Sequence, residues 1–416
     1  MDLDLQTFLR DPLEGGAKVA GWLGRRWAAV IGVPAALGLL LVYLLPRIAS
    51  RAGARGSARV LRQAGRQALG WSGLDLALTS GLPLLRLSYP PIRGAFFYLF
   101  SGRAMISAGA ALPALAAALL GRDLPLWARR GLVGALWAAH GAAAAAEFYA
   151  TYLGGQNLGA SRHALDFPGR TPGAAPVRLR LAQLSDLHVE RLTRREDAAV
   201  AMLRKLRPDL ILLTGDFLSI DYYDVASYEA LRELMTAIGG LAPPLGVYAC
   251  LGNVDPPQLV ATLLDGTGVR LLEDTAVTLP MEEQRVQILG AATSRGHRWE
   301  FDLPHFEAAV AAADAQGAAD LRVLLYHTPD LAPQAAAAGV DLYLCGHTHG
   351  GQIRLPLLGA LRTGSRFGRR YVIGLNRLPN GGYLYTNRGL GFEGMHLPRV
   401  RFLCPPEVAV FDVSLG

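Results

Sequence analysis

The chain has 416 residues, of which 51% are hydrophobic and only 18% are charged, and its formal net charge is +7. Residues 1–176 carry 18 Lys and Arg against 8 Asp and Glu (net +10), whereas residues 177–416 carry 23 against 26 (net −3). Because the basic part has no zinc-finger spacing, no aromatic RNA-binding signature and arginines that flank apolar runs, its charge argues against a nucleic-acid partner and for a membrane.

Residues 1–153 contain a series of apolar segments. The first, residues 27–45, is an uninterrupted apolar run about as long as a helix that crosses the hydrocarbon core. It starts too late and is too long for the apolar core of a signal peptide, so a persistent transmembrane helix is the better interpretation. Residues 104–120 and 131–153 are predicted to cross as well. A fourth crossing at 71–89 is left open, because its clean apolar core is short.

The segment 131–153 contains His140 and Glu147, two ionisable residues that are costly to place inside a membrane. They are either a functional pair or, as we favour, a histidine that faces a neighbouring helix and a glutamate near the interface. The Arg-rich stretch 47–66 favours the cytoplasmic side. Three crossings then place the C-terminal half inside and four place it outside, so the sequence predicts a multi-pass protein of the cell membrane without deciding the face.

Residues 154–177 are rich in Gly, Pro and small polar residues, which predicts a linker. In residues 178–416 the pattern changes to short apolar runs that alternate with helical stretches, which is typical of a layered α/β domain. Predicted strands are 179–184, 210–213, 246–251, 286–289, 322–326 and 341–344, and predicted helices are 196–206, 227–238, 305–315 and 331–338.

Polar residues recur where the apolar runs of this domain end. Ligands gather beyond the carboxyl ends of strands in α/β sheets, so five loops could present these side chains to one point. Neighbouring glycines would let the backbone approach that point closely. The residues concerned are Asp186, His188, Asp216, Asn253, His327, His347 and His349.

Imidazole nitrogens and carboxylate oxygens are suited to binding divalent transition metals. Two such ions about 3.5–4 Å apart can grip a phosphate and activate a water. A carboxylate has two oxygens and can bridge the ions, and the amide oxygen of Asn adds a ligand without adding charge. The pattern predicts a binuclear centre of Mn, Fe, Zn or Mg, and the identity of the metal stays open.

The order Asp-x-His, Gly-Asp, Gly-Asn, His, Gly-His-x-His resembles the calcineurin-like metallophosphoesterase family over residues 178–410. The resemblance implies a four-layer double β-sandwich flanked by helices, preceded here by the transmembrane region. It also implies that one ion is held by Asp186, His188, Asp216 and His349. The other would be held by Asp216, Asn253, His327 and His347, with Asp216 bridging the two.

Three further strings look like a narrower, membrane-bound bacterial branch: Gly-His-Thr-His-Gly-Gly-Gln at 346–352, Asn-Arg-Gly-Leu-Gly at 387–391 and Pro-Pro-Glu at 405–407. That branch includes enzymes similar to the UDP-2,3-diacylglucosamine pyrophosphatases of lipid A synthesis. The expected substrate is therefore a phosphodiester or pyrophosphate, and a lipid-linked one is among the candidates.

One position departs from the family pattern. Val254 stands where the family usually has a His that stabilises the transition state or protonates the leaving oxygen. The following Asp255 keeps its place, and His396, with Arg388 as a cationic alternative, is the first candidate to replace the missing group. The expected catalytic residues are Asp216, Asn253, Asp255 and His396.

We therefore expect a membrane-anchored, metal-dependent phosphoesterase. Because Val254 cannot transfer a proton, the alternative is a catalytically weak, metal-organised binding module. A third, weaker hypothesis places function in the membrane part, as a transporter-like bundle with a regulatory hydrolase. The oligomeric state stays open.

Overall fold

The structure is a computed structural model that describes residues 40–84, 94–168, 173, 175–219, 223–294, 299–393 and 399–416, without the side chains of 76–101. The chain divides into two compact units. The helical unit lies within residues 1–148, and the α/β unit begins at Tyr149 and contains the C-terminus.

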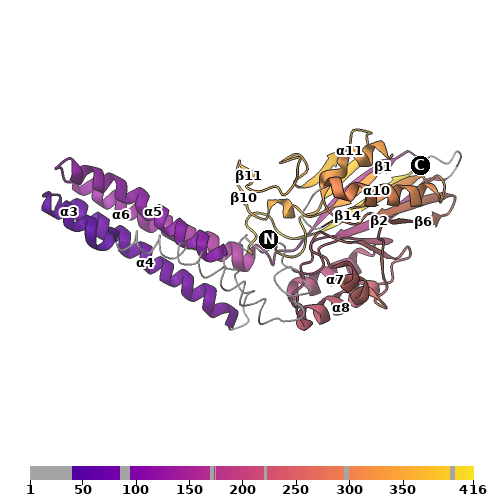
Figure 1. Cartoon of the computed structure of the whole chain (residues 1–416), viewed down its shortest axis with the longest axis horizontal. Helices are drawn as coiled ribbons and strands as arrows, with labels where there is room; N and C mark the ends of the chain where they lie inside the picture. Colours follow the sequence, from indigo (N-terminus) through magenta and orange to yellow (C-terminus); the bar gives the residue numbers. More distant parts are fainter. Residues whose placement is uncertain are drawn as a thin grey trace. The chain divides into compact units, whose positions relative to one another are not determined.

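The helical unit consists of long helices that pack along one another (Figure 1). A short π-helical turn (Leu40–Leu44) leads into α3 (Leu45–Arg51), followed by α4 (Arg55–Leu84), α5 (Gly94–Leu119) and α6 (Leu126–Phe148). Its interior is lined mainly by alanines such as Ala58, Ala64 and Ala114, all fully buried. Alanine favours the helix and lets helix backbones approach closely, which explains the tight α4–α5 packing.

Arg103 of α5 lies at the centre of a buried ionic cluster. Its side chain, 1% exposed, binds both carboxylate oxygens of Asp75 in α4 at 2.8 and 2.9 Å. It also donates to the backbone oxygen of His140 in α6 at 2.5 Å and lies 3.8 Å from Glu147. The His140 ring contacts Ser107 of α5 at 3.1 Å, so His140 does face a neighbouring helix, as the favoured interpretation expected.

The predicted crossings have different outcomes. Most of residues 27–45 lies outside the described residues, as does the end of the segment 71–89, whose first part belongs to α4. The segment 104–120 corresponds to α5. Among the described helices, the window Gly102–Leu119 of α5 is the one that is long and apolar enough to cross a membrane. Residues 131–153 form most of α6 and a π-helical end, Tyr149–Leu153.

The α/β unit is built on two six-stranded sheets in the part of the chain that is described. The first has the order β1-β14-β2-β3-β4-β5 and the second β12-β13-β9-β8-β7-β6. The strands of the first sheet are β1 (Gly159–Phe167), β2 (Val177–Leu184), β3 (Leu210–Thr214), β4 (Val247–Cys250), β5 (Val269–Leu271) and β14 (Glu407–Leu415). The strands of the second are β6 (Thr275–Met281), β7 (Gln284–Gly290), β8 (Leu321–Leu325), β9 (Leu342–Cys345), β12 (Gly374–Arg377) and β13 (Tyr383–Thr386).

The two sheets pack face to face and helices cover their outer faces, which gives four layers (Figure 1). In β2, Leu179 and Leu181 point into the core between the sheets, whereas Ala182 and Leu184 point toward the helices. This alternation follows from the two-residue period of a strand, and both faces are apolar because both are covered. The predicted α/β class is confirmed.

The helices divide between the outer faces of the two sheets. The first sheet is covered by α7 (Arg194–Leu206), α8 (Val225–Gly239) and α9 (Pro257–Leu264), and the second by α10 (Trp299–Asp314) and α11 (Ala332–Ala337). A capping box at Thr193 and Glu196 starts α7, and a similar one at Asp224 and Ser227 starts α8. The predicted helices of this unit lie within one to six residues of these bounds.

The predicted linker at residues 154–177 requires a correction. Residues 159–167 form β1, which pairs in parallel with β14 along its whole length, from Gly159 opposite Glu407 to Phe167 opposite Leu415. The strand has no apolar run, and Leu165 and Phe167 are its buried hydrophobic residues. Pairing with the C-terminal strand, rather than local propensity, determines its conformation.

Candidate metal centre

The predicted ligands lie in loops that follow strands of both sheets. Strands β2, β3 and β4 are mutually parallel, as are β7, β8 and β9, so the carboxyl ends within each set meet at one edge. Asp186 and His188 follow β2, Asp216 follows β3 and Asn253 follows β4. His327 follows β8, and His347 and His349 follow β9.

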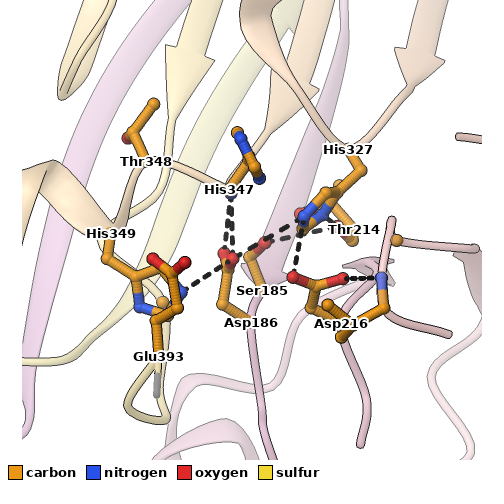
Figure 2. Close-up of polar contacts among 12 residues, drawn as sticks. Ser185, Asp186, Thr214, Asp216, His327, His347, Thr348, His349 and Glu393 are labelled. Carbon is orange, nitrogen blue, oxygen red and sulfur yellow. Dashed lines mark hydrogen bonds and ion pairs between the residues drawn. The ribbon is translucent and has the colours of Figure 1, made fainter. Parts of the chain in front are cut away.

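These side chains form two adjacent groups, part of which is drawn in Figure 2. Asp186, His188 and His349 form the first, and Asp216, His327 and His347 form the second; within each group one ligand atom per residue lies within 4.8 Å of the others. The division matches the one implied by the family resemblance.

Asp216 faces both groups. Its Oδ2 lies 3.1 Å from Nε2 of His327 and 3.6 Å from Nε2 of His188. In the first group, Nε2 of His349 lies 3.3 Å from Oδ1 of Asp186 and 3.1 Å from Nε2 of His188. The carboxylate of Asp216 therefore contacts a histidine of each group.

Backbone contacts orient the imidazole rings of the second group. Nδ1 of His327 lies 2.7 Å from the oxygen of Thr214, so its Nε2 faces Asp216. Nε2 of His347 lies 3.0 Å from the backbone oxygen of Gly364. Contacts of this type fix the tautomer and the orientation of metal-ligating histidines.

Asn253 provides a test of whether these residues fit a metal. The residue is 8% exposed, and no group in the described part of the chain donates a hydrogen bond to its side-chain oxygen. A buried amide oxygen without a donor is costly unless it has another electrophilic partner. A divalent cation is such a partner, and the surrounding imidazole and carboxylate donors suit one. The donor set therefore fits a binuclear centre.

Burial keeps the rings of the first group neutral, as metal binding requires. It lowers the pKa of His188 to about 4 and holds the pKa of His349 well below its usual value, and the charges of His188 and Arg401 add to the effect at His349. Burial would also lower the pKa of His327, but the negative charge of Asp216 outweighs it and raises that pKa to about 10.

The backbone is strained at the predicted ligands. Asp186, His188, Asp216, His347 and His349 have φ values between +42° and +65°, in the left-handed region that side chains disfavour. Such strain costs of order 1–3 kcal/mol per residue and persists where function requires it. Five of the seven predicted ligands share this feature, which the sequence does not reveal.

Glycine is required beside the ligands because the backbone there lies very close to the ligand side chains. A Cβ atom on Gly252 would lie 2.1 Å from Oδ1 of Asp216, and one on Gly346 would lie 2.1 Å from Oδ2 of Asp186. Both distances are far below van der Waals contact. Any side chain at Gly252 or Gly346 would therefore displace a ligand carboxylate, which confirms the role predicted for these glycines.

Val254 and Asp255 hold Asp216 in place. The N–H of Val254 donates to Oδ1 of Asp216 at 3.1 Å. The carboxylate of Asp255 accepts from the N–H groups of Asp216 and Gly252 at one oxygen and of Phe217 at the other, each at 2.8 Å. Because both oxygens already accept hydrogen bonds from the backbone, the geometry favours a positioning role for Asp255 over the expected catalytic one.

The two candidates for the missing His have separate outcomes. His396 lies outside the described residues. Arg388 donates to Glu407, through its backbone N–H at 2.8 Å and its guanidinium at 2.7 Å. Glu407 belongs to the Pro-Pro-Glu string, so these contacts explain why two of the branch-like strings lie together.

Sequence reasoning missed Glu393. Figure 2 draws its side chain together with the residues of the metal centre. Its N–H donates to the side-chain oxygen of Gln352 at 2.8 Å, and its backbone oxygen accepts from the Gln352 amide at 3.3 Å. Burial and the negative charges of Asp216 and Asp186 raise the pKa of Glu393 to about 7. The sequence marks Glu393 only indirectly, because its partner Gln352 belongs to the string that contains His347 and His349.

The chain matches a family model and several known proteins. Residues 179–355 match the calcineurin-like phosphoesterase superfamily domain. Phosphodiesterase YaeI of Escherichia coli is 31% identical over 260 residues, which are 61% of this chain and 87% of that protein. The uncharacterized metallophosphoesterase YkuE of Bacillus subtilis is 28% identical over 68% of this chain and 96% of its own length.

A third relative is the UDP-2,3-diacylglucosamine pyrophosphatase LpxG of Chlamydia muridarum, which is 25% identical over 56% of this chain and 82% of its own length. The matched regions contain the strand-end residues that form the two groups described above. The chain therefore belongs to the calcineurin-like phosphoesterase superfamily and is a hydrolase that acts on phosphoester bonds.

Proposed function

We propose that the protein is a membrane-anchored phosphoesterase that hydrolyses a phosphodiester or pyrophosphate bond with two divalent ions. The observation that carries the proposal is the pair of adjacent ligand groups with Asp216 between them. Asn253, whose neighbour Val254 donates to Asp216, has a buried side-chain oxygen without a hydrogen-bond donor in the described part of the chain. Mn, Fe, Zn and Mg can all be bound by a mixed set of imidazole, carboxylate and amide ligands, so the ligand types do not distinguish among these metals.

The ions and the residues around them would have separate roles in this mechanism. When bound, a pair of divalent ions supplies positive charge for the phosphoryl oxygens and lowers the pKa of water. The residues of the two groups, Asp216 among them, would hold the ions, and Asp255 accepts a hydrogen bond from the backbone of Asp216 and positions it. No proton donor stands at position 254, so substrates with good leaving groups are expected to react fastest.

The membrane anchor is supported by an inside-out distribution of residues in the helical unit. Arg103, Asp75 and His140 are buried, whereas large apolar side chains such as Trp127 (78% exposed) and Met105 (74% exposed) face outward. A soluble bundle would bury the latter and expose the former. Outward apolar and inward ionisable side chains are typical of helices in lipid. A multi-pass arrangement agrees with this distribution.

A lipid-linked substrate is the favoured class. Anchoring places the centre near substrates that are themselves confined to a membrane. The similarity to LpxG, which is named for a diacylated sugar nucleotide, supports the same class, and the name of YaeI supports a phosphodiester. The alternative is a metal-organised binding module with weak turnover, which Val254 favours because it removes the usual proton donor.

Hydrolysis of bis-p-nitrophenyl phosphate tests the proposal. The full chain in detergent would be assayed with added Mn²⁺ beside Asp216→Asn, with Asp265→Asn as the control because Asp265 is exposed and lies outside both groups. We expect metal-dependent hydrolysis that Asp216→Asn abolishes and Asp265→Asn retains. Absence of hydrolysis by a folded chain with two ions bound would instead favour the binding module.

A further inference from the structure

A small hairpin in the α/β unit presents leucines to solvent. Strands β10 (Arg354–Leu355) and β11 (Gly359–Ala360) pair antiparallel, and residues 356–358 form the tip. Leu357 is fully exposed, Leu358 is 56% exposed and Leu361 is 58% exposed. The other exposed large hydrophobic residues in the described part of this unit, such as Val225 and Phe301, are scattered along the sequence. Clustered exposed apolar side chains indicate an interaction site.

The backbone at the tip strengthens this inference. Leu357 has a φ of +65°, in the region that Gly adopts without strain and a leucine adopts at a cost. The N–H of Leu358 donates to the oxygen of Pro356 at 2.8 Å, which closes the turn around Leu357. Neither the strain nor the exposure of Leu357 stabilises the fold, so the residue serves a contact outside it.

The charge around the hairpin indicates the chemistry of the partner. Residues 350–392 contain seven Arg and no Asp, Glu or Lys. Of these, Arg362, Arg366, Arg369 and Arg370 are exposed. A surface that binds exposed leucines and exposed arginines of one segment needs an apolar interior and a negatively charged boundary. An anionic lipid bilayer combines these properties at the depth of its headgroups.

The hairpin is tied to the metal centre on both sides. Gln352 precedes it and pairs with the backbone of Glu393. Gly364 follows it and its oxygen lies 3.0 Å from Nε2 of His347. A hairpin anchored at these two points would hold the ligand loops close to any surface on which its tip rests.

We propose that the tip of the β10–β11 hairpin enters the headgroup region of an anionic phospholipid bilayer. Leu357 and Leu358 would contact acyl chains, and the exposed arginines would bind phosphate groups. The inference deepens the proposed function, on which it rests for the presence of a membrane, by stating which surface of the α/β unit meets the lipid that carries the substrate.

Site-specific fluorescence tests the proposal. The full chain would carry an environment-sensitive nitrobenzoxadiazole label at Leu358→Cys, which can be selective because the three native cysteines are buried. Val225→Cys at the start of α8, 69% exposed, is the matched control. Both would be reconstituted in nanodiscs of phosphatidylcholine with or without phosphatidylglycerol.

We expect a blue shift and quenching by lipid-attached nitroxides for the label at 358 but not at 225. The effect should need phosphatidylglycerol and weaken with salt. An unshifted label at 358, an equal shift at 225 or indifference to phosphatidylglycerol would each overturn the proposal.

A second variant separates this proposal from the proposed function. Leu357→Asp together with Leu358→Asp should retain hydrolysis of the soluble bis-p-nitrophenyl phosphate, because neither residue belongs to the metal centre. Introduced beside a label at Leu361→Cys, the double variant should abolish the lipid-dependent shift of that label. Retention of the shift would refute the insertion of the tip. The proposed phosphoesterase activity would be refuted only if the parent chain failed to hydrolyse bis-p-nitrophenyl phosphate.

Discussion

Val254 replaces a proton donor with a side chain that cannot transfer protons, while its backbone N–H still binds Asp216. Val254→His should therefore leave the positioning intact and restore an acid beside the leaving group. Because general acid catalysis contributes roughly 10²–10⁴-fold, we expect kcat/KM to rise at least about tenfold for an alkyl phosphodiester. Hydrolysis of bis-p-nitrophenyl phosphate, whose leaving group needs no acid, should change little. An equal increase for both substrates would contradict this role.

Figure 2 draws Glu393 at the metal centre, and burial together with the negative charges of Asp216 and Asp186 raises its pKa, an effect that a bound cation would oppose. We expect Glu393→Gln to weaken Mn²⁺ binding by roughly 10–100-fold, as losses of supporting metal-site partners do. Titration followed by electron paramagnetic resonance would measure this directly. Glu307→Gln, at an exposed position in α10, is the control, and equal affinity in the two variants would remove Glu393 from the centre.

Among the helices, the ionic cluster around Arg103 joins α4, α5 and α6. Arg103→Met would leave Asp75 buried without its partner, and breaking a buried pair in this way costs about 3–5 kcal/mol. We expect a markedly lower melting temperature of the helical unit, measured by circular dichroism in detergent. Arg122→Met, at an exposed position, should have little effect.

The double variant Arg103→Met with Asp75→Asn distinguishes an ionic contact from simple loss of packing. Because the two residues are in direct contact, their effects should not add, and the double variant should be more stable than the sum of the single losses implies. Additive losses would mean that the ion pair contributes nothing of its own.

For the whole molecule, metal binding should stabilise one unit and not the other. Both ligand groups lie in the α/β unit, and an ion present at 100 times its Kd adds about 2.7 kcal/mol to the stability of the state that binds it. Chelation should therefore lower the melting temperature of the α/β unit by several degrees and leave the helical transition unchanged. Calorimetry of the full chain measures both, and a shift of both transitions or of neither would contradict the assignment.

The sequence alone determined the α/β class, most strands and helices of residues 178–345 and the ligand residues that meet at the strand ends. It could do so because a strand buried on both faces requires an apolar run, and a loop that holds a metal requires Asp, His or Asn directly after it. Helix bounds were predicted to within two residues for α7, α8 and α11, whereas α10 begins six residues before its predicted start. The family order of the motifs supplied the division into two groups before any geometry was available.

Tertiary structure decided what depends on contacts between distant segments. The strand β1 forms because β14 pairs with it, although its own residues predict a linker. The backbone of Glu393 is held by the side chain of Gln352, 41 residues earlier, and no local pattern marks this contact. The role of Asp255 follows from the amides that surround its carboxylate, and the partner of Arg103 lies 28 residues away on another helix. Local sequence encodes propensity and ligand type, whereas hydrogen-bond partners and burial are properties of the folded chain.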